Sequence, residues 1–232
     1  MWRWLAVASL SMLGACNVVL TKDPVFTQAD AAGAPTLRPG VWLIFEEPDC
    51  KVDTAKPFVD WPDCAGGGLV NGNEIAGHKS GAPKDVLEKT PVVLAAGDPR
   101  VAQLPVDVDV SAQASASASA SGGAQASASA TGGGQARPYG YAGVRPTKFD
   151  AQGRITAFRF WPVACGPPPP KDKNGADVAA GTLHPLPGMQ MKPGDAYCAT
   201  ASKAAIRAAA KASEAWAESP IPEAHWLRDA ER

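Results

Sequence analysis

Two compact turns, each flanked by a pair of apolar runs, constrain the fold of this chain most strongly. Residues 91–96 and 101–106 flank Gly97-Asp98-Pro99, and residues 139–149 and 154–165 flank Asp150-Ala151-Gln152-Gly153. Turn residues between two such runs predict β-hairpins. Consecutive hairpins predict an antiparallel sheet, so we expect an α+β domain built on an antiparallel β meander.

Two further strands are expected before these hairpins. The run from Val41 to Phe45 is apolar at every position, which predicts a strand buried on both faces. A weaker strand is predicted over residues 69–75. The hydrophobic residues amount to 45% of the chain, but 44 of them are Ala, which buries little surface, so the core must be small. Gly 23 and Pro 22 indicate that turns and loops are extensive.

The C-terminal part of the chain predicts a helix rich in Ala. Asp195 is a good N-cap for a helix over residues 196–218, which Ser219-Pro220 would end. Its large apolar residues are Tyr197, Ile206 and Trp216, and its Ala face allows close approach to the sheet. Residues 222–227 are expected to form a final short turn or helix.

The first sixteen residues have the features of an export signal. Met1-Trp2-Arg3 carries one positive charge, and residues 4–13 are an apolar run, which is shorter than the roughly 20 residues that a membrane-spanning helix needs. The run ends in Leu13-Gly14-Ala15-Cys16, which resembles the lipobox of bacterial lipoproteins. The resemblance implies cleavage between Ala15 and Cys16, a diacylglycerol on the Cys16 thiol, and acylation, for example by palmitate, of the new amino group.

The resemblance also implies a location. Two or more acyl chains hold a protein firmly on a bilayer, so the mature chain would be anchored in membrane lipid without spanning it. Asn17, and not Asp, follows Cys16, which by the sorting rule of this family implies the outer membrane, with the domain facing the periplasm. An ordinary secretory signal peptide that precedes a Cys by chance, and a cytosolic protein with a misassigned start, are the alternatives.

The four remaining cysteines predict two disulfides in an oxidising compartment. Of the three connectivities we prefer Cys50 with Cys64, which bracket a polar loop, and Cys165 with Cys198, which join a strand to the predicted helix. Each bridge would add roughly 3 to 4 kcal/mol of stability. A four-cysteine metal site is disfavoured, because the chain has no closely spaced Cys pair of the kind that zinc sites use. We therefore expect no metal.

These signals divide the chain into seven segments. A signal peptide (1–15) and a lipidated leader (16–36) precede the first half of the β domain (37–110). A Ser/Ala/Gly-rich insertion (111–136) is expected to be disordered, with silk-like self-assembly as the alternative. A hairpin (137–165) completes the sheet, and a proline-rich connector (166–194) leads to the helical segment (195–232). Within the leader, only Val25 and Phe26 are expected to reach the core.

The sequence offers no constellation of catalytic residues. His78, His184 and His225 lie far apart, and there is no GxSxG nucleophile motif. The 22 Lys+Arg against 23 Asp+Glu exclude a basic nucleic-acid binder. We expect no enzyme and no cofactor, but an envelope protein with a structural or interaction role and an unidentified envelope partner. The alternative is a carrier of a small apolar ligand in a cavity of roughly 300 Å³ or more, lined by Trp42, Trp61 and Trp161, which otherwise fill the core.

Overall fold

The computed structural model describes residues 17–47, 49–62, 64–78, 83, 86–106, 137–168, 184–191, 197–217 and 221–230. The predicted signal peptide, Cys16 and the 111–136 insertion lie outside the described residues.

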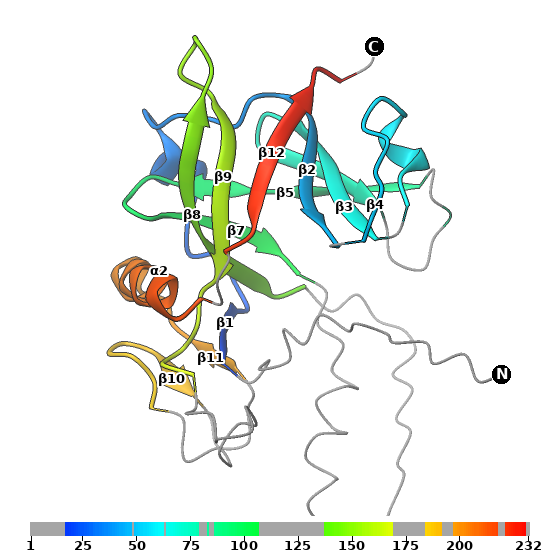
Figure 1. Cartoon of the computed structure of the whole chain (residues 1–232). Coiled ribbons are helices and arrows are strands. Elements are labelled where there is room, and N and C mark those ends of the chain that lie inside the picture. The colour runs from blue at the N-terminus through cyan, green and yellow to red at the C-terminus, as the bar shows by residue number, and fades with distance from the viewer. Residues whose placement is uncertain are drawn as a thin grey trace, which may run out of the picture.

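Among the residues that the structure describes, twelve strands form one sheet, and one α-helix packs on it (Figure 1). This confirms the predicted α+β class. The strand order is β10-β11-β1-β8-β9-β12-β2-β3-β4-β5, with β7 paired to β8 and β6 to β7. The strands are β1 (Val18–Thr21), β2 (Gly40–Glu46), β3 (Ala65–Asn71), β4 (Glu74–His78), β5 (Leu87–Pro91), β6 (Val93–Ala95), β7 (Arg100–Pro105), β8 (Tyr139–Phe149), β9 (Ile155–Pro162), β10 (Gln190–Met191), β11 (Tyr197–Ala199) and β12 (Glu223–Arg228). All paired strands are antiparallel except β1 and β11, which run parallel.

Both hairpins predicted from the turns are present. β6 pairs with β7 and β8 with β9, each antiparallel across its turn. Asp150 shows why the second turn forms, since its Oδ1 accepts hydrogen bonds from the backbone N–H groups of Gln152 (3.0 Å) and Arg154 (2.9 Å). Gly153 follows with φ +75°, a conformation that suits glycine.

The single strand expected over residues 69–75 is wrong, because the chain reverses there. β3 and β4 are joined by a turn at Gly72 and Asn73, and Gly72 has φ +61°. A residue with this φ ends a strand, and glycine adopts it at no steric cost. β3 also begins earlier than expected, at Ala65, so that the triple-glycine run lies inside the sheet.

β2 has the predicted position but is not buried along its whole length. Val41 and Trp42 are buried, whereas Phe45 is 43% exposed. The exposed end of β2 pairs with Gly66 and Ala65, and the Phe45 ring lies over Gly66. The far end of this strand therefore packs on glycine and leaves one face open to solvent.

The segment predicted as a polar leader is part of the fold. β1 lies in the sheet between β8 and β11, and residues 28–31 form a short 3-10 helix, η1 (Gln28–Ala31). Phe26 is buried as expected, but so is Val19 of β1. Gln103 of β7 fixes this segment, because its Oε1 accepts from the N–H groups of Val25 and Phe26 (2.8 Å each) and its Nε2 donates to the Phe26 carbonyl (2.9 Å).

The helix, α2 (Lys203–Trp216), begins later than predicted. Ser202 is its N-cap, with Oγ accepting from the Ala205 N–H (3.2 Å), whereas Asp195 lies outside the described residues. Tyr197 and Cys198 belong to β11, where they pair with Val18 and Val19. Helix propensity alone assigns these residues to the first helical turn, but pairing with β1 and β10 makes them a strand.

α2 packs on the sheet through small side chains, as its Ala content predicted. Its buried residues are Ala205, Ile206, Ala209, Ala210 and Ser213. The indole N–H of Trp161 donates to the Ala210 carbonyl (2.8 Å), and the Trp161 ring lies over Gly143, where a Cβ would approach the indole to 2.4 Å. Glycine at this position in β8 therefore gives the tryptophan its place between sheet and helix.

Two ion pairs hold the ends of α2. Arg145 of β8 donates to both carboxylate oxygens of Glu214 (2.6 and 2.7 Å) and to Asp98 (2.6 Å). These hydrogen bonds raise the pKa of Arg145 and lower the pKa of Glu214. At the other end Lys203 Nζ donates to both oxygens of Asp30 in η1 (2.7 and 2.8 Å). This pair and, next in importance, the hydrogen bond from the Thr27 N–H (2.8 Å) lower the pKa of Asp30 to about 2.

The Asp30 pKa predicts a pH dependence of stability. Because the folded-state pKa lies below the ordinary value of 3.8, this pair stabilises the fold above pH 4 and the stabilisation is lost as pH falls towards 2. Asp30→Asn should remove it and Lys203→Gln should remove its largest part, each with a loss below about 1 kcal/mol at pH 7. Acid unfolding monitored by circular dichroism between pH 4 and 2 should be steeper in the parent than in either variant. Equal steepness in all three would contradict the prediction.

The last described segment is a central strand and not the turn or helix expected at residues 222–227. β12 pairs with β9 on one side and with β2 on the other, and Ala224 is fully buried. Figure 1 shows β12 in red between β9 and β2, although β2 precedes it by some 180 residues in the chain. The sheet is thus completed by the C-terminal strand.

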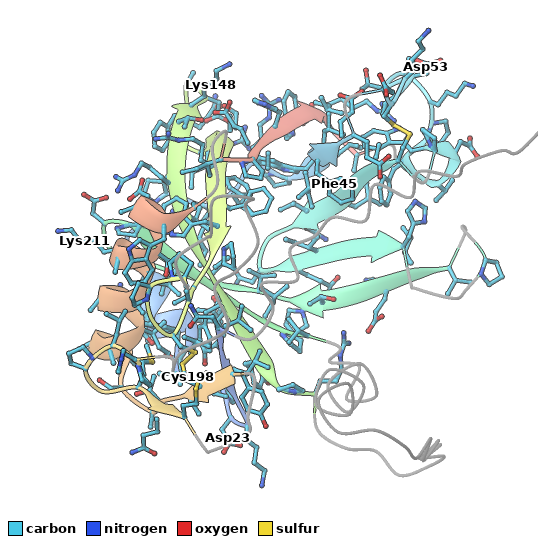
Figure 2. The ribbon with its side chains drawn as sticks, turned by 60° about the horizontal axis from the view of Figure 1, so that its bottom comes forward. Asp23, Phe45, Asp53, Lys148, Cys198 and Lys211 are labelled. Atoms are coloured by element: carbon cyan, nitrogen blue, oxygen red, sulfur yellow. A yellow bond between two sulfur atoms is a disulfide. The ribbon has the colours of Figure 1, made fainter. Side chains whose placement is uncertain are left out.

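The predicted connector (166–194) also contributes to the fold where it is described. It supplies β10 and the buried Met189, which packs in the same cluster as Ile206. Pro169 and Pro170 of the tetraproline lie outside the described residues. Figure 2 shows Lys148 and Asp53 at one end of the molecule and Cys198 at the other.

Candidate functional site

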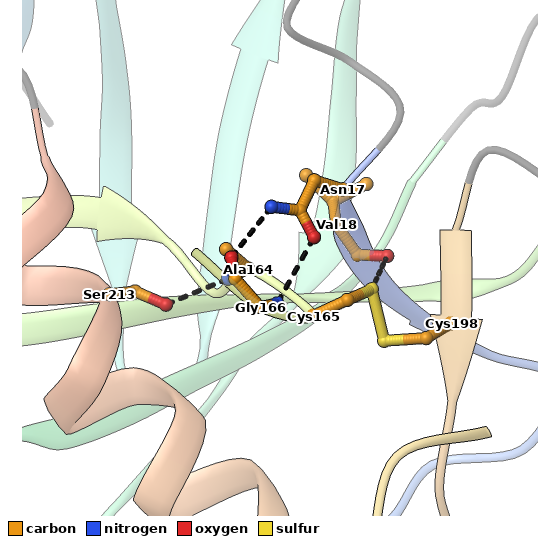
Figure 3. The surroundings of a disulfide bond; sticks show 7 residues. All are labelled: Asn17, Val18, Ala164, Cys165, Gly166, Cys198 and Ser213. Atoms are coloured by element: carbon orange, nitrogen blue, oxygen red, sulfur yellow. Dashed lines mark hydrogen bonds between the residues drawn. A yellow bond between two sulfur atoms is a disulfide. The ribbon is translucent and has the colours of Figure 1, made fainter. Parts of the chain in front are cut away.

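The position at which the described chain enters the sheet is fixed by Asn17 (Figure 3). Its Nδ2 donates to the Gly166 carbonyl (2.6 Å), and its Oδ1 accepts from the Gly166 N–H (3.1 Å). Both bonds are buried, and Asn17 is only 8% exposed. The residue directly after the predicted lipid attachment site is therefore a fixed part of the fold.

The backbone around Asn17 is paired as closely as its side chain. The Cys165 N–H donates to the Asn17 carbonyl (2.7 Å), and the Val19 N–H donates to the Val163 carbonyl (3.0 Å). On the other side of Cys165, its own carbonyl accepts from the Leu186 N–H (2.7 Å). β1 is thus attached to the end of β9 from its first residue onward.

The disulfides have the predicted connectivity. Cys165 pairs with Cys198 (Cα–Cα 5.8 Å) and Cys50 with Cys64 (Cα–Cα 5.6 Å). The first bridge is fully buried in the main core cluster, and Cys165 Sγ lies 3.1 Å from the Val18 carbonyl oxygen (Figure 3). The second closes a loop at the opposite end of the molecule. Cys198 therefore secures β11 next to β1. The expectation that Cys198 ties the helix to the sheet is wrong.

Further along β1, a buried hydroxyl pair continues this attachment. Thr21 Oγ1 lies 2.6 Å from the Tyr141 hydroxyl, and burial raises the pKa of Tyr141. Sequence reasoning did not identify Asn17, Thr21 or Tyr141 as fixed positions. The available signal was the short run Val18-Val19-Leu20, whose β-branched and apolar residues favour a strand.

Replacing Asn17 with Asp should destabilise the fold. A carboxylate cannot donate to Gly166, and its second oxygen would face the carbonyl oxygen that Nδ2 now contacts at 2.6 Å. We expect a loss of about 3 kcal/mol, against about 1 to 2 kcal/mol for Asn17→Ser, which leaves no buried charge. Urea unfolding at pH 7 measures both. An Asp variant as stable as the parent would contradict this account of Asn17.

The three tryptophans proposed as a ligand cup do not come together. Trp42 and Trp161 are almost fully buried, with indole N–H groups that donate to the carbonyls of Arg38 (2.9 Å) and Ala210 (2.8 Å). Trp61 lies in a separate cluster with Phe58, beneath the loop closed by Cys50 and Cys64. All three positions therefore fit the core role, which was the preferred interpretation of these residues.

Neither of two hollows in the described part is an apolar ligand cavity. One, beside the buried Arg100, has a volume of about 30 Å³, enough for one or two water molecules. Arg100 donates there to the carbonyl of Leu94 (3.1 Å) and to that of Pro35, and burial lowers its pKa. The other, of about 280 Å³, is lined by Lys51, Asp53, Lys56, Asp60, Trp61 and Pro62.

The histidines remain as dispersed as the sequence suggested. The His78 ring packs against Phe58 with centroids 4.5 Å apart, His225 Nε2 lies 3.6 Å from Glu223, and His184 is exposed. Among the residues that the structure describes, no group of three or more His, Cys, Asp or Glu side chains is placed to hold a metal ion.

Comparisons with known protein families, with curated proteins and with solved structures find no match to this chain. Within the described ranges, α2 is too short and too polar to cross a bilayer, and no other helix there could do so.

Proposed function

We propose that this chain is a lipid-anchored protein of the bacterial envelope with a non-catalytic structural or interaction role. The observation that carries the proposal is the Leu13-Gly14-Ala15-Cys16 motif, which ends an apolar run of export-signal length. The domain that follows begins at the next residue. A diacylglycerol on Cys16 and an acylated amino group would anchor it to membrane lipid.

The two disulfides support export. Such bridges persist in oxidising compartments and are rare in the cytosol. The bridge between Cys165 and Cys198 is buried in the core and joins segments far apart in the chain. A domain whose apolar residues are so often Ala gains proportionally more from such bridges than one with a large core.

An interaction role is favoured over that of an apolar-ligand carrier. A carrier needs a closed apolar cavity of roughly 300 Å³ or more, whereas the larger hollow is lined mainly by Lys and Asp. The tryptophans assigned to such a cavity pack in the core instead. The sorting rule that accompanies the lipobox resemblance places the protein at the outer membrane, facing the periplasm, where its partner would be another envelope protein.

Metabolic labelling with a clickable fatty acid tests the anchor. The parent chain should be labelled, and Cys16→Ser should lose the label, because no other residue takes the glyceride. Ser11→Ala, a substitution in the apolar run outside the motif, should keep it. An unlabelled parent, or a Cys16→Ser variant labelled as strongly as the parent, would contradict the proposal.

A further inference from the structure

We propose that the end of the domain around Asn17 lies against the lipid headgroups, so that the protein is held flush on the membrane in one orientation. We name this end the tether face and define it by the exposed residues Pro167, Pro168, His184 and Pro185 together with Asn17. The inference rests on the proposed function, since it requires a lipidated Cys16.

The distance between the anchor and the fold carries the argument. Consecutive Cα atoms are 3.8 Å apart, so a lipidated Cys16 leaves no spacer between the glyceride and Asn17. The headgroup layer on each side of a bilayer is only roughly 6 Å thick. With its acyl chains in the hydrocarbon, Cys16 therefore brings Asn17 to the headgroups.

The fold cannot supply the missing spacer by releasing its first residues. Asn17 is held by two side-chain hydrogen bonds to Gly166 and by the Cys165 N–H. Val19 is buried, and its N–H donates to the Val163 carbonyl. Its pairing with Cys198 places it beside the disulfide. Peeling β1 away would expose this part of the core, so the first residue of β1 stays in the sheet and the end of the domain around it meets the membrane.

The surface around Asn17 suits a headgroup layer. Gly166 lies against the His184 carbonyl and the Pro185 Cα, which brings residues 166–168 and 184–186 side by side. Pro167, Pro168 and Pro185 are exposed, and the described residues 164–168 and 184–186 contain no Asp, Glu, Lys or Arg. The exposed proline rings offer apolar surface to the interface.

The orientation places the opposite end of the molecule away from the bilayer. Lys148 pairs with Ala157 near the tip of the β8–β9 hairpin, and the extended chain from Ala157 to Cys165 spans roughly 25 Å. The loop closed by Cys50 and Cys64 lies at the same end as Lys148 (Figure 2).

Photo-crosslinking to lipid tests the orientation. A photoreactive phenylalanine is placed at Pro168, at Pro185 or at the distal Lys148, all exposed positions, in the full lipidated protein. Each is reconstituted into vesicles of phosphatidylethanolamine and phosphatidylglycerol. We expect lipid adducts, measured by mass spectrometry, to be at least about fivefold more frequent at positions 168 and 185 than at 148.

A spacer variant provides the matched control. Inserting Asn followed by a Gly-Ser spacer of about 20 residues after Cys16 gives the domain a free reach of about 25 Å. The adducts at positions 168 and 185 should then fall several-fold, towards the level at position 148.

The intact mass of the N-terminal peptide separates the two proposals. Equal adducts at all three positions in a chain shown to carry the glyceride would overturn the orientation and leave the anchor standing. So would adducts that the spacer leaves unchanged. A chain whose Cys16 carries no lipid would overturn both.

Discussion

Replacing Ala224 with Asp is expected to unfold the domain or to lower its free energy of unfolding by about 4 kcal/mol or more. Ala224 is fully buried in β12, between β9 and β2, in the cluster that contains Trp42 and Ile155. A carboxylate there has no described partner and would be buried without compensation. Urea unfolding monitored by tryptophan fluorescence measures the loss.

The adjacent residue of the same strand provides the control. His225 is partly exposed, so His225→Asp introduces the same charge into β12 without burying it. Its proximity to Glu223 adds like-charge repulsion of below about 1 kcal/mol. If Ala224→Asp were no more destabilising than His225→Asp, β12 would not be the central strand of the sheet.

Removing the buried disulfide should have the second large effect. The bridge between Cys165 and Cys198 closes a segment of 33 residues, for which chain entropy gives about 3.7 kcal/mol. Cys165→Ala with Cys198→Ala also removes two buried sulfur atoms from the main cluster, so we expect a total loss of about 4 to 5 kcal/mol. The midpoint of denaturant unfolding should fall accordingly.

The other bridge allows a direct comparison. Cys50 and Cys64 close a segment of 14 residues at the surface, for which the same relation gives about 3 kcal/mol. Cys50→Ala with Cys64→Ala should therefore cost less than the loss of the buried pair. If the Cys50→Ala, Cys64→Ala variant lost more stability than the Cys165→Ala, Cys198→Ala variant, the buried bridge would not hold β11 and the end of β9 against β1.

Local signals in the sequence predicted the local parts of the fold. The turns at Gly97-Asp98-Pro99 and at Asp150-Gly153 define their hairpins because turn residues act on the chain beside them. The Ala-rich segment forms a helix because its own residues favour one. The disulfide partners were also predicted correctly, since each bridge joins segments that the local interpretation had already placed at strand or loop ends.

The parts that were missed depend on distant partners. Residues 223–228 contain a proline-flanked polar and aromatic mixture with weak strand propensity, and only β9 and β2 make them a strand. The first helical turn was misplaced because β1 and β10 pair with β11. Asn17 was read as a sorting residue alone, because its bonds to Gly166 join positions 149 residues apart.

Asn17 therefore has two interpretations, as a sorting residue and as a structural residue, that experiment can separate. Substitutions at this residue alter both the position read by the sorting rule and a buried hydrogen-bonded pair. A change in the membrane location of the Asn17→Asp variant is informative only if the stability of that variant is measured as well. Asn17→Ser, which avoids the buried charge, gives the comparison with less damage to the fold.

The mass of the N-terminal peptide, taken from protein extracted from the membrane, tests the central claim most directly. The account predicts that the chain begins at Cys16, that residues 1–15 are absent, and that Cys16 carries a diacylglycerol and an acyl chain. A peptide that retains Gly14-Ala15 before Cys16, with an unmodified thiol, would contradict it.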